Sequence, residues 1–332
     1  MLNVLRCMDT IDLVALAMTS RKSAFCVESA KIKLRDPLVV VNSKGIEVHF
    51  FLLTGEYCFF LFFSYGKLPT ADVYDASQPR YVAIRSPYRP YHLLRTMTGH
   101  GVKLWMDYLK YLFHYSRVSR LQFLENAHHL DLYSIKRTFP NFDILTISAL
   151  LSLERNREIL KAFHPVRQLT LQNHVFQERK LPDSVIIQNF DEFTIGRDSA
   201  LPIVLTLDDV MLFNTKRISI SKINFTEKDA NRLIKFWIRG VCPRWERIHF
   251  CTLSRYAIDK KMMFKGIKYQ EAPVHRIHYF KNAFEGFTGT VNGGVDIWNK
   301  DGYRATINFV PCDHFVGFNL HVWYPHCVSE KL

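Results

Sequence analysis

The chain has 332 residues, of which 48% are hydrophobic, and this is enough apolar material to bury a core in more than one domain. Its 44 Lys and Arg against 31 Asp and Glu give a formal net charge of +13, which favours acidic partners or nucleic acid through non-specific attraction. The basic residues are dispersed, with no run of five or more, a pattern more typical of a solvated surface than of a nucleic-acid site.

The cysteines and the apolar stretches bear on the compartment. Seven cysteines are widely spread, form no C-x-x-C pair and follow no secretory leader, so we expect reduced thiols in the cytosol or nucleus. The most apolar stretch, residues 49–63, is interrupted by Thr54-Gly55-Glu56 and is shorter than the roughly 20 residues of a membrane-spanning helix. We predict a buried hairpin there and no membrane association.

The predicted secondary structure of the N-terminal part changes from helix to strand near Lys31. The first 31 residues carry Leu13 and Leu16 at helical spacing after a possible cap at Asp9, and predict two or three short helices. Residues 38–41, 46–53 and 57–63 then predict an antiparallel β-meander.

Two further elements complete this part. The proline-containing residues 68–90 predict an irregular excursion, and residues 102–115 predict a helix. The apolar face expected for the helix consists of Val102, Trp105, Leu109, Leu112 and Phe113.

The central part contains an internal repeat of short apolar-polar-apolar strands. The triplets end at residues 123, 147, 171, 195, 220 and 250, so the steps are 24, 24, 24, 25 and 30 residues. All steps but the last fall within the period of leucine-rich repeats, about 20 to 29 residues. Amphipathic helices are predicted between the strands at residues 149–163 and 226–239, the second with a capping box from Thr226 and Asp229 and a stop at Gly240.

The expected fold class is therefore α/β, or α+β overall, with a leucine-rich-repeat-like α/β solenoid. Chance periodicity in an apolar-rich chain is the alternative. After the repeat, residues 276–280, 295–298, 305–310 and 315–323 predict strands around turns at residues 292–294 and 300–302. These strands predict a β-rich C-terminal end.

The chain offers little sign of chemistry. It lacks the phosphate-loop, dinucleotide, zinc-protease and serine-hydrolase signatures, so we expect neither an enzyme nor a cofactor. The pairs His128-His129, Cys312-x-His314 and His326-Cys327 could each supply part of a metal site, but none has the spacing of a zinc module, and we predict no metal. Most aromatic residues fall on apolar faces, which favours core packing over base stacking.

Two separate regions of the chain carry motifs that can be compared with known families. The N-terminal region reads Val4-Leu5-x-x-Met8-Asp9-x-x-Asp12-Leu13-x-x-Leu16-Ala17-x-x-Ser20-Arg21-Lys22. The later segments are Gly101-Val102-Lys103-x-Trp105, Leu205-Thr-Leu-Asp-Asp-Val210, Asn231-x-x-Ile234-Lys235-x-Trp237-Ile238-x-Gly240, Asp296-Ile297, Lys300-Asp301-Gly302 and Ala305-Thr306-Ile307. The first region resembles the latter two thirds of an F-box and the later segments resemble a type 2 F-box-associated domain, so the chain is similar to the F-box proteins that carry this domain.

The resemblance implies a domain division and a function. Residues 1–31 would be a partial F-box, truncated because the family's leucine-proline start precedes the position of Met1. Residues 32–332 would be the F-box-associated domain, with a meander and helix in 32–115, the repeat in 116–256 and the β-rich end in 257–332. The implied function is a substrate receptor of a Skp-cullin-F-box ubiquitin ligase. Docking on the Skp-family adaptor would use Met8, Asp12, Leu13, Leu16 and Ser20, for which plain helix packing is the alternative.

Stacked repeats would also define a surface for an unknown protein target. If the outer residues of each triplet face the core, the middle residues line an exposed concave sheet, together with their same-face neighbours two positions earlier. These residues are Arg120, Gln122, Thr146, Gln168, Thr170, Glu192, Thr194, Arg217, Ser219, Arg247 and His249. The excursion at residues 68–90 and the loops of the β-rich end are alternatives for the target site. A binding module without ligase engagement, because the F-box is incomplete, and a basic nucleic-acid-binding protein are the alternative functions.

Overall fold

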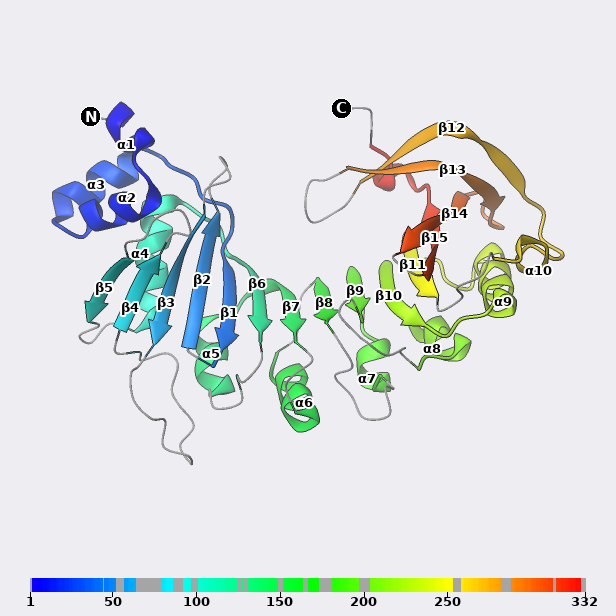
Figure 1. Cartoon of the computed structure of the whole chain (residues 1–332), viewed down its shortest axis with the longest axis horizontal. Coiled ribbons are helices and arrows are strands. Elements are labelled where there is room, and N and C mark those ends of the chain that lie inside the picture. Colours follow the sequence, from blue (N-terminus) through cyan, green and yellow to red (C-terminus); the bar gives the residue numbers. More distant parts are fainter. Residues whose placement is uncertain are drawn as a thin grey trace. The chain divides into compact units, whose positions relative to one another are not determined.

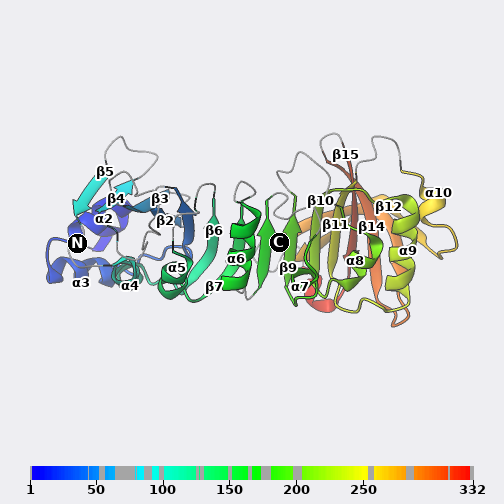
Figure 2. The same cartoon turned by 90° about the horizontal axis from the view of Figure 1, so that it is seen from below.

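The computed structural model forms two compact units, Met1–Val166 and Arg167–Leu332, and each is described by itself (Figure 1, and Figure 2 in a view turned by 90°). The described residues are 2–43, 45–51, 57–63, 79, 81–85, 92–96, 101–124, 127, 131–148, 152–163, 167–172, 181–196, 204–252, 258–281, 288–312 and 315–329.

The first unit begins with three short helices, as predicted. They are α1 (Leu2–Cys7), α2 (Thr10–Ala17) and α3 (Arg21–Ser29). The Asp9 side chain accepts a hydrogen bond from Asp12 N at 2.9 Å, and Ser20 accepts one from Ser23 N at 3.1 Å, so each of the last two helices starts at a side-chain cap. Leu13 and Val27 are buried where α2 and α3 pack together.

The sheet of the first unit has the order β7-β6-β1-β2-β3-β4-β5. Its strands are β1 (Leu38–Asn42), β2 (Gly45–Phe51), β3 (Tyr57–Phe63), β4 (Tyr81–Arg85), β5 (His92–Thr96), β6 (Val118–Phe123) and β7 (Phe142–Ile147). Strands β1 to β5 pair antiparallel, which confirms the predicted meander and hairpin, whereas β6 pairs parallel with both β1 and β7. The predicted turn at residues 54–56 lies outside the described residues.

Strand β4 corrects the prediction of an irregular excursion over residues 68–90. Residues 81–85 pair with β3, and Val82, Ala83 and Ile84 are buried. The rest of the excursion, except residue 79, lies outside the described residues. The strand was not predicted because its apolar residues 82–84 are few and stand among prolines and polar residues.

Helices cover the sheet of the first unit. The predicted helix α4 (Val102–Phe113) buries Val102, Leu109 and Phe113, and its Trp105 ring lies 6.2 Å from the Phe62 ring of β3. Helices α5 (Leu132–Thr138) and α6 (Leu153–Ala162) follow β6 and β7 in the chain. The second of these was predicted and the first was not.

The sheet of the second unit has the order β12-β13-β14-β15-β11-β10-β9-β8. Its strands are β8 (Gln168–Leu171), β9 (Glu192–Ile195), β10 (Arg217–Ile223), β11 (Arg247–Thr252), β12 (Gln270–Lys281), β13 (Thr288–Trp298), β14 (Arg304–Cys312) and β15 (Phe315–Val322). Strands β8 to β11 pair parallel and the remaining neighbours pair antiparallel. The helices are α7 (Asp183–Ile186), α8 (Leu207–Leu212), α9 (Glu227–Ile238), α10 (Lys260–Met263) and the 3₁₀ helix η3 (Pro325–Cys327).

The repeat prediction locates the six central strands correctly. Each predicted triplet lies in one of β6 to β11, and within each unit the triplets pair parallel and in register, for example Leu169 with Phe193 and Ile218 with Ile248. Every outer residue of the six triplets is at most 2% exposed, so these side chains form the core beneath the strands. The coarse prediction of a mixed α/β fold is confirmed. The leucine-rich-repeat-like solenoid stays an interpretation.

The C-terminal strands β12, β13 and β14 are longer than predicted, β15 matches its prediction to within one residue, and one predicted turn is wrong. Residues 292–294 lie inside β13, opposite a shift of register in β12 between Ala272 and Ile277. Gly294 has φ +101, and a Cβ added to it would lie 2.6 Å from the Ile307 carbonyl oxygen, so glycine is required there by conformation and by space. The predicted turn at residues 300–302 does link β13 to β14.

Helix α9 begins at the predicted capping box. Thr226 Oγ1 accepts a hydrogen bond from Asp229 N at 3.3 Å, and Asp229 Oδ2 accepts one from Thr226 N at 3.1 Å. We expect Thr226→Ala to lower the free energy of unfolding by about 1 kcal/mol, because the Asp229 N–H loses the hydroxyl oxygen that accepts its hydrogen bond. Urea unfolding measures this loss, and Thr226→Ser, which keeps the hydroxyl, is the control. An unchanged midpoint for the alanine variant would contradict the expectation.

Candidate protein-interaction site

Polar side chains run across the sheet of the second unit in two rows, because residues paired across neighbouring strands point to the same face. The middle row, defined by the strand registers, is Thr170, Thr194, Ser219, His249, Asn319 and Asn308. The second row is Gln168, Glu192, Arg217, Arg247, His321, Thr306 and Asp296. Eight of the predicted target-binding residues therefore lie together on one face.

The middle row offers hydroxyl and amide groups. Thr170, Thr194 and Ser219 are half-buried. His249 Nδ1 lies 2.7 Å from Asn319 Oδ1, and its Nε2 lies 3.4 Å from Cys251 Sγ. Burial lowers the pKa of His249, so this ring is neutral at neutral pH and the row is uncharged.

The second row is charged, and part of it is covered. Arg217 forms an ion pair of 2.9 Å with Glu246 and lies 5.9 Å from the centre of the Phe280 ring of β12. Both partners of this ion pair are buried. The expectation that Arg217 is exposed on the sheet is therefore wrong, because the C-terminal strands supply a cover that the repeat alone does not.

Asp296 is the most enclosed acid of the second row, at 4% exposed. It accepts hydrogen bonds from Arg276 Nη1, from Arg276 Nη2 at 2.8 Å and from Thr306 Oγ1 at 2.6 Å, and Thr306 also accepts one from Trp323 Nε1 at 2.7 Å. Burial alone would raise the pKa of Asp296, but the hydrogen bonds from Arg276 and Thr306 bring it below its ordinary value. This carboxylate is held charged and fully paired.

A set of three possible metal ligands lies beside Arg217. One atom each from Glu246, His326 and Cys327 lie within 4.8 Å of one another. Burial, followed by the Glu246 charge, raises the pKa of the Cys327 thiol to about 12, and the Arg217 guanidinium already compensates the Glu246 carboxylate. A protonated thiol and a paired carboxylate do not fit a cation site, so we interpret this set as a structural ion-pair cluster. Residues 128–129 and 313–314 lie outside the described residues.

The three predicted target-binding residues of the first unit differ in their burial. Arg120 and Gln122 are half-buried on β6. Thr146 on β7 is 3% exposed, so the expectation that it lines an open surface is wrong. The target-binding role of all eleven residues stays a prediction, and Thr146 and Arg217 are poorly placed for it.

Sequence reasoning missed the residues that continue both rows on β13, β14 and β15. Asn308 and Asn319 extend the middle row, and His321, Thr306 and Asp296 extend the second. The alternation Asn319-x-His321 inside a predicted strand was the available signal. It could not be used because the pairing of β15 with β11 joins segments about 70 residues apart.

The predicted adaptor-docking residues lie on the N-terminal helices or next to them. Leu13 is buried between helices and Ser20 caps α3, whereas Met8, Asp12 and Leu16 are half-buried. Among the side chains of these helices whose exposure the structure describes, the most exposed large apolar ones are Val4 at 65% and Phe25 at 63%. Adaptor docking stays a prediction, with Leu13 and Ser20 serving the packing and capping of the helices themselves.

Comparison with known proteins identifies the segment that carries the rows. Residues 181–250, from the residues before α7 to β11, match the family described as F-box associated, so the second unit contains an F-box associated region. The chain is also similar to F-box associated domain-containing protein sdz-33 of Caenorhabditis elegans, with 21% identity over 222 residues. The matched part is 66% of this chain and 64% of that protein, so the chain spans slightly less than two thirds of the relative's length. No solved structure matches the chain.

These matches confirm the resemblance to F-box associated proteins; the truncation of the F-box stays a prediction. Within the described ranges, no helix is both long enough and apolar enough to cross a bilayer.

Proposed function

We propose that the protein is a non-enzymatic substrate receptor of a Skp-cullin-F-box ubiquitin ligase. The observation that carries the proposal is the F-box associated match to residues 181–250, which coincides with α7 to β11 and the charged and hydroxyl rows on them. The resemblance to F-box associated proteins implies a substrate adaptor rather than an enzyme. A receptor of this kind needs no catalytic residue, because holding a target near the conjugating enzyme raises its effective concentration.

The target contact is proposed for the open part of the two rows. Thr194 and Ser219 are paired on the neighbouring strands β9 and β10 and offer hydroxyl groups on one face, with Glu192 half-buried on the same face of β9. Such side chains give directional hydrogen bonds, which set specificity, and the flanking charges guide the approach of a partner. The repeat-like arrangement of β8 to β11 supplies the rigid support, in the manner of a leucine-rich-repeat-like solenoid.

The adaptor contact is proposed for the N-terminal helices. Met8, Asp12 and Leu16 keep part of their surface open, and Val4 and Phe25 add exposed apolar area. An apolar helical surface of this type is suited to a helical partner such as a Skp-family adaptor. The protein would then act in the cytosol or nucleus, where such ligases work.

The first test mixes the purified full chain with a Skp-family adaptor and measures complex formation by size-exclusion chromatography and calorimetry. We expect a stoichiometric complex with the wild type and loss of about tenfold in affinity, equal to 1.4 kcal/mol, for Leu16→Glu combined with Phe25→Glu. Tyr133→Ala, an exposed change elsewhere in the first unit, is the control. If the folded chain does not bind the adaptor, the proposed ligase engagement is wrong, and the alternative function of a binding module without ligase engagement is favoured.

The second test addresses the target face in cells. Proximity labelling with the wild type is compared with Thr194→Arg combined with Ser219→Arg, which places bulky charges on the middle row. Partners that are lost in this variant and kept by Lys228→Glu, an exposed change on α9, are candidate targets. The cullin-dependent ubiquitination of these partners should also decrease in the Thr194 and Ser219 variant. If both variants label the same partners equally, the middle row does not bind the target.

A further inference from the structure

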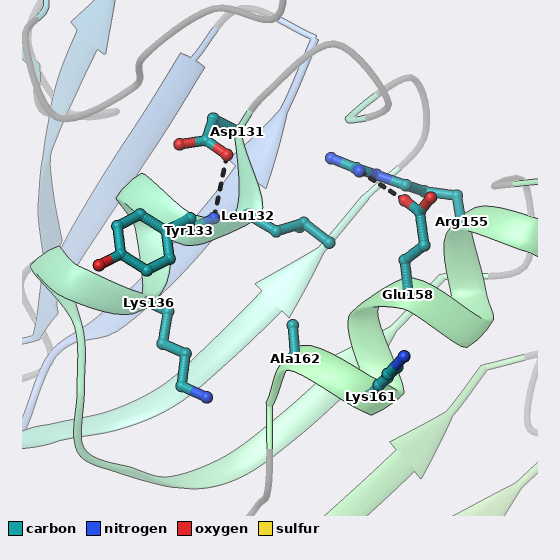
Figure 3. A pocket seen from close by; sticks show the side chains of 8 residues that line it. All are labelled: Asp131, Leu132, Tyr133, Lys136, Arg155, Glu158, Lys161 and Ala162. Atoms are coloured by element: carbon teal, nitrogen blue, oxygen red, sulfur yellow. Dashed lines mark hydrogen bonds and ion pairs between the residues drawn. The ribbon is translucent and has the colours of Figure 1, made fainter.

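A pocket of 580 Å³ opens in the first unit between α5 and α6, on residues that the proposed function does not use (Figure 3). Its lining consists of Asp131, Leu132, Tyr133, Lys136, Arg155, Glu158, Lys161 and Ala162. This volume lies within the range of sites that take a small ligand or the anchoring side chains of a peptide. Helices α5 and α6 follow consecutive strands of the sheet, so the walls of the pocket are fixed by the fold.

The two carboxylates of the pocket are already occupied. Asp131 caps α5 by accepting hydrogen bonds from Tyr133 N at 3.1 Å and Ser134 N at 2.8 Å. Glu158 pairs with Arg155 Nη1 at 2.8 Å on the same helix. Figure 3 draws the contact of Asp131 with Tyr133 N and the Arg155–Glu158 pair, so both carboxylates already have partners within the protein.

The two lysines of the pocket differ from the carboxylates in this respect. Lys136 on α5 and Lys161 on α6 are exposed, and neither forms an ion pair with any described residue. In Figure 3 both side chains lie at the end of the pocket away from Asp131 and Arg155. Two ammonium groups from facing helices make this end attractive to an anion.

An apolar surface lies beside the lysines. Leu132 and Ala162 contribute aliphatic side chains, and the Tyr133 side chain is 73% exposed and presents most of its ring to solvent. An exposed ring with a hydroxyl group is a common anchor in protein recognition, because it combines apolar area with a hydrogen bond and has little conformational entropy to lose. The pocket therefore places an apolar surface next to its anion-attracting end.

We propose that this pocket binds an acidic peptide segment of a protein partner, an inference that rests on the proposed receptor function for the source of the peptide. A Glu or Asp carboxylate of the peptide lies between Lys136 and Lys161, and a neighbouring aliphatic side chain packs on Leu132 and Ala162 beside the Tyr133 ring. Nucleic acid fits less well, since its affinity depends on many phosphate contacts and the pocket supplies two lysines.

The test uses the full chain and two fluorescein-labelled ten-residue peptides of alternating residues, one of Glu and Leu and one of Gln and Leu. Fluorescence anisotropy should show binding of the Glu peptide at least about tenfold tighter than that of the Gln peptide. Lys136→Glu combined with Lys161→Glu should abolish the difference, and Tyr133→Ala should weaken both peptides by about threefold. The matched control is Lys228→Glu combined with Lys265→Glu, which changes the net charge equally on exposed positions of the second unit.

Three results would overturn the proposal. They are equal affinity for the two peptides, an equal loss in the control variant, and displacement of the Glu peptide by a mixed oligonucleotide at lower concentration than by unlabelled peptide. The adaptor complex is measured on the same pocket variant and should be unchanged. If the wild type does not bind the adaptor, the proposed ligase engagement is wrong. The proposal for the pocket is then still judged by the peptide affinities.

Discussion

Replacing Arg276 with methionine should lower the free energy of unfolding of the second unit by about 3 kcal/mol. The reason is the position of Asp296, which is 4% exposed and receives two hydrogen bonds from the Arg276 guanidinium. Without the guanidinium the carboxylate stays buried with Thr306 as its remaining close donor and Arg304 at 3.8 Å. Removing one partner of an enclosed ion pair costs more than the pair contributes, because the other charge is left uncompensated.

Urea unfolding followed by tryptophan fluorescence measures this loss, since Trp323 donates to Thr306 in the same network. The matched control is Arg304→Met, which removes a more exposed guanidinium that lies farther from Asp296, and we expect a loss below about 1 kcal/mol for it. Adding Asp296→Leu to Arg276→Met should recover part of the stability, because the buried charge then disappears. Equal unfolding midpoints for the Arg276 and Arg304 variants would show that Asp296 does not depend on Arg276.

Mild acid should destabilise the second unit through His321. This ring is 7% exposed and lies 5.2 Å from the Phe280 ring and 6.3 Å from the Trp323 ring. Burial, with a smaller effect from Arg247 and His249, lowers the pKa of His321 to about 3. Below about pH 6.5 the unfolded chain takes up a proton that the folded chain does not, so the free energy of unfolding decreases by about 1.4 kcal/mol for each pH unit.

Between pH 6.5 and pH 5 we therefore expect His321 alone to remove about 2 kcal/mol, with His249 acting in the same direction because burial also lowers its pKa. His321→Gln should reduce the slope of stability against pH by about one proton in this window. The acidic pairs act elsewhere: Asp191 and Asp296 have lowered pKa values, so their stabilisation is lost only as the pH falls below about 4. An unchanged slope in the glutamine variant would exclude His321 as the source.

The elements that sequence predicted well are those whose signal is local. Alternation within each triplet places Leu145, Phe193 and Ile248 in the core, and the spacing Thr226-x-x-Asp229 places the start of α9. Asn292-Gly293-Gly294 carries a strong turn signal, but the positive φ of these glycines serves an irregularity inside β13. Glycine in the sequence indicates that a positive φ is possible at that position. Whether this φ belongs to a turn or to a bulge inside a strand depends on the neighbouring strand.

The candidate sites were less predictable because they combine distant segments. The face of the two rows followed from strand periodicity, but the burial of Arg217 depends on Phe280, which arrives about 60 residues later in the chain. The pocket between α5 and α6 was not anticipated, since the short helix at Leu132–Thr138 carries no sustained apolar period. No local pattern reports which side chains two helices will bring together.

The pairing of β11 with β15 has a consequence for the order in which the second unit can form. A chain cut after residue 250 would end inside β11, leave its edge unpaired along Ile248 and Phe250, and remove the Phe318 ring that lies 6.3 Å from that of Phe250. The same cut would take away His326, which lies 3.0 Å from Glu246. During synthesis, the last strand of the F-box associated segment is therefore enclosed only after about 70 further residues have been made. We expect the shortest fragment that folds by itself to be longer than the matched segment.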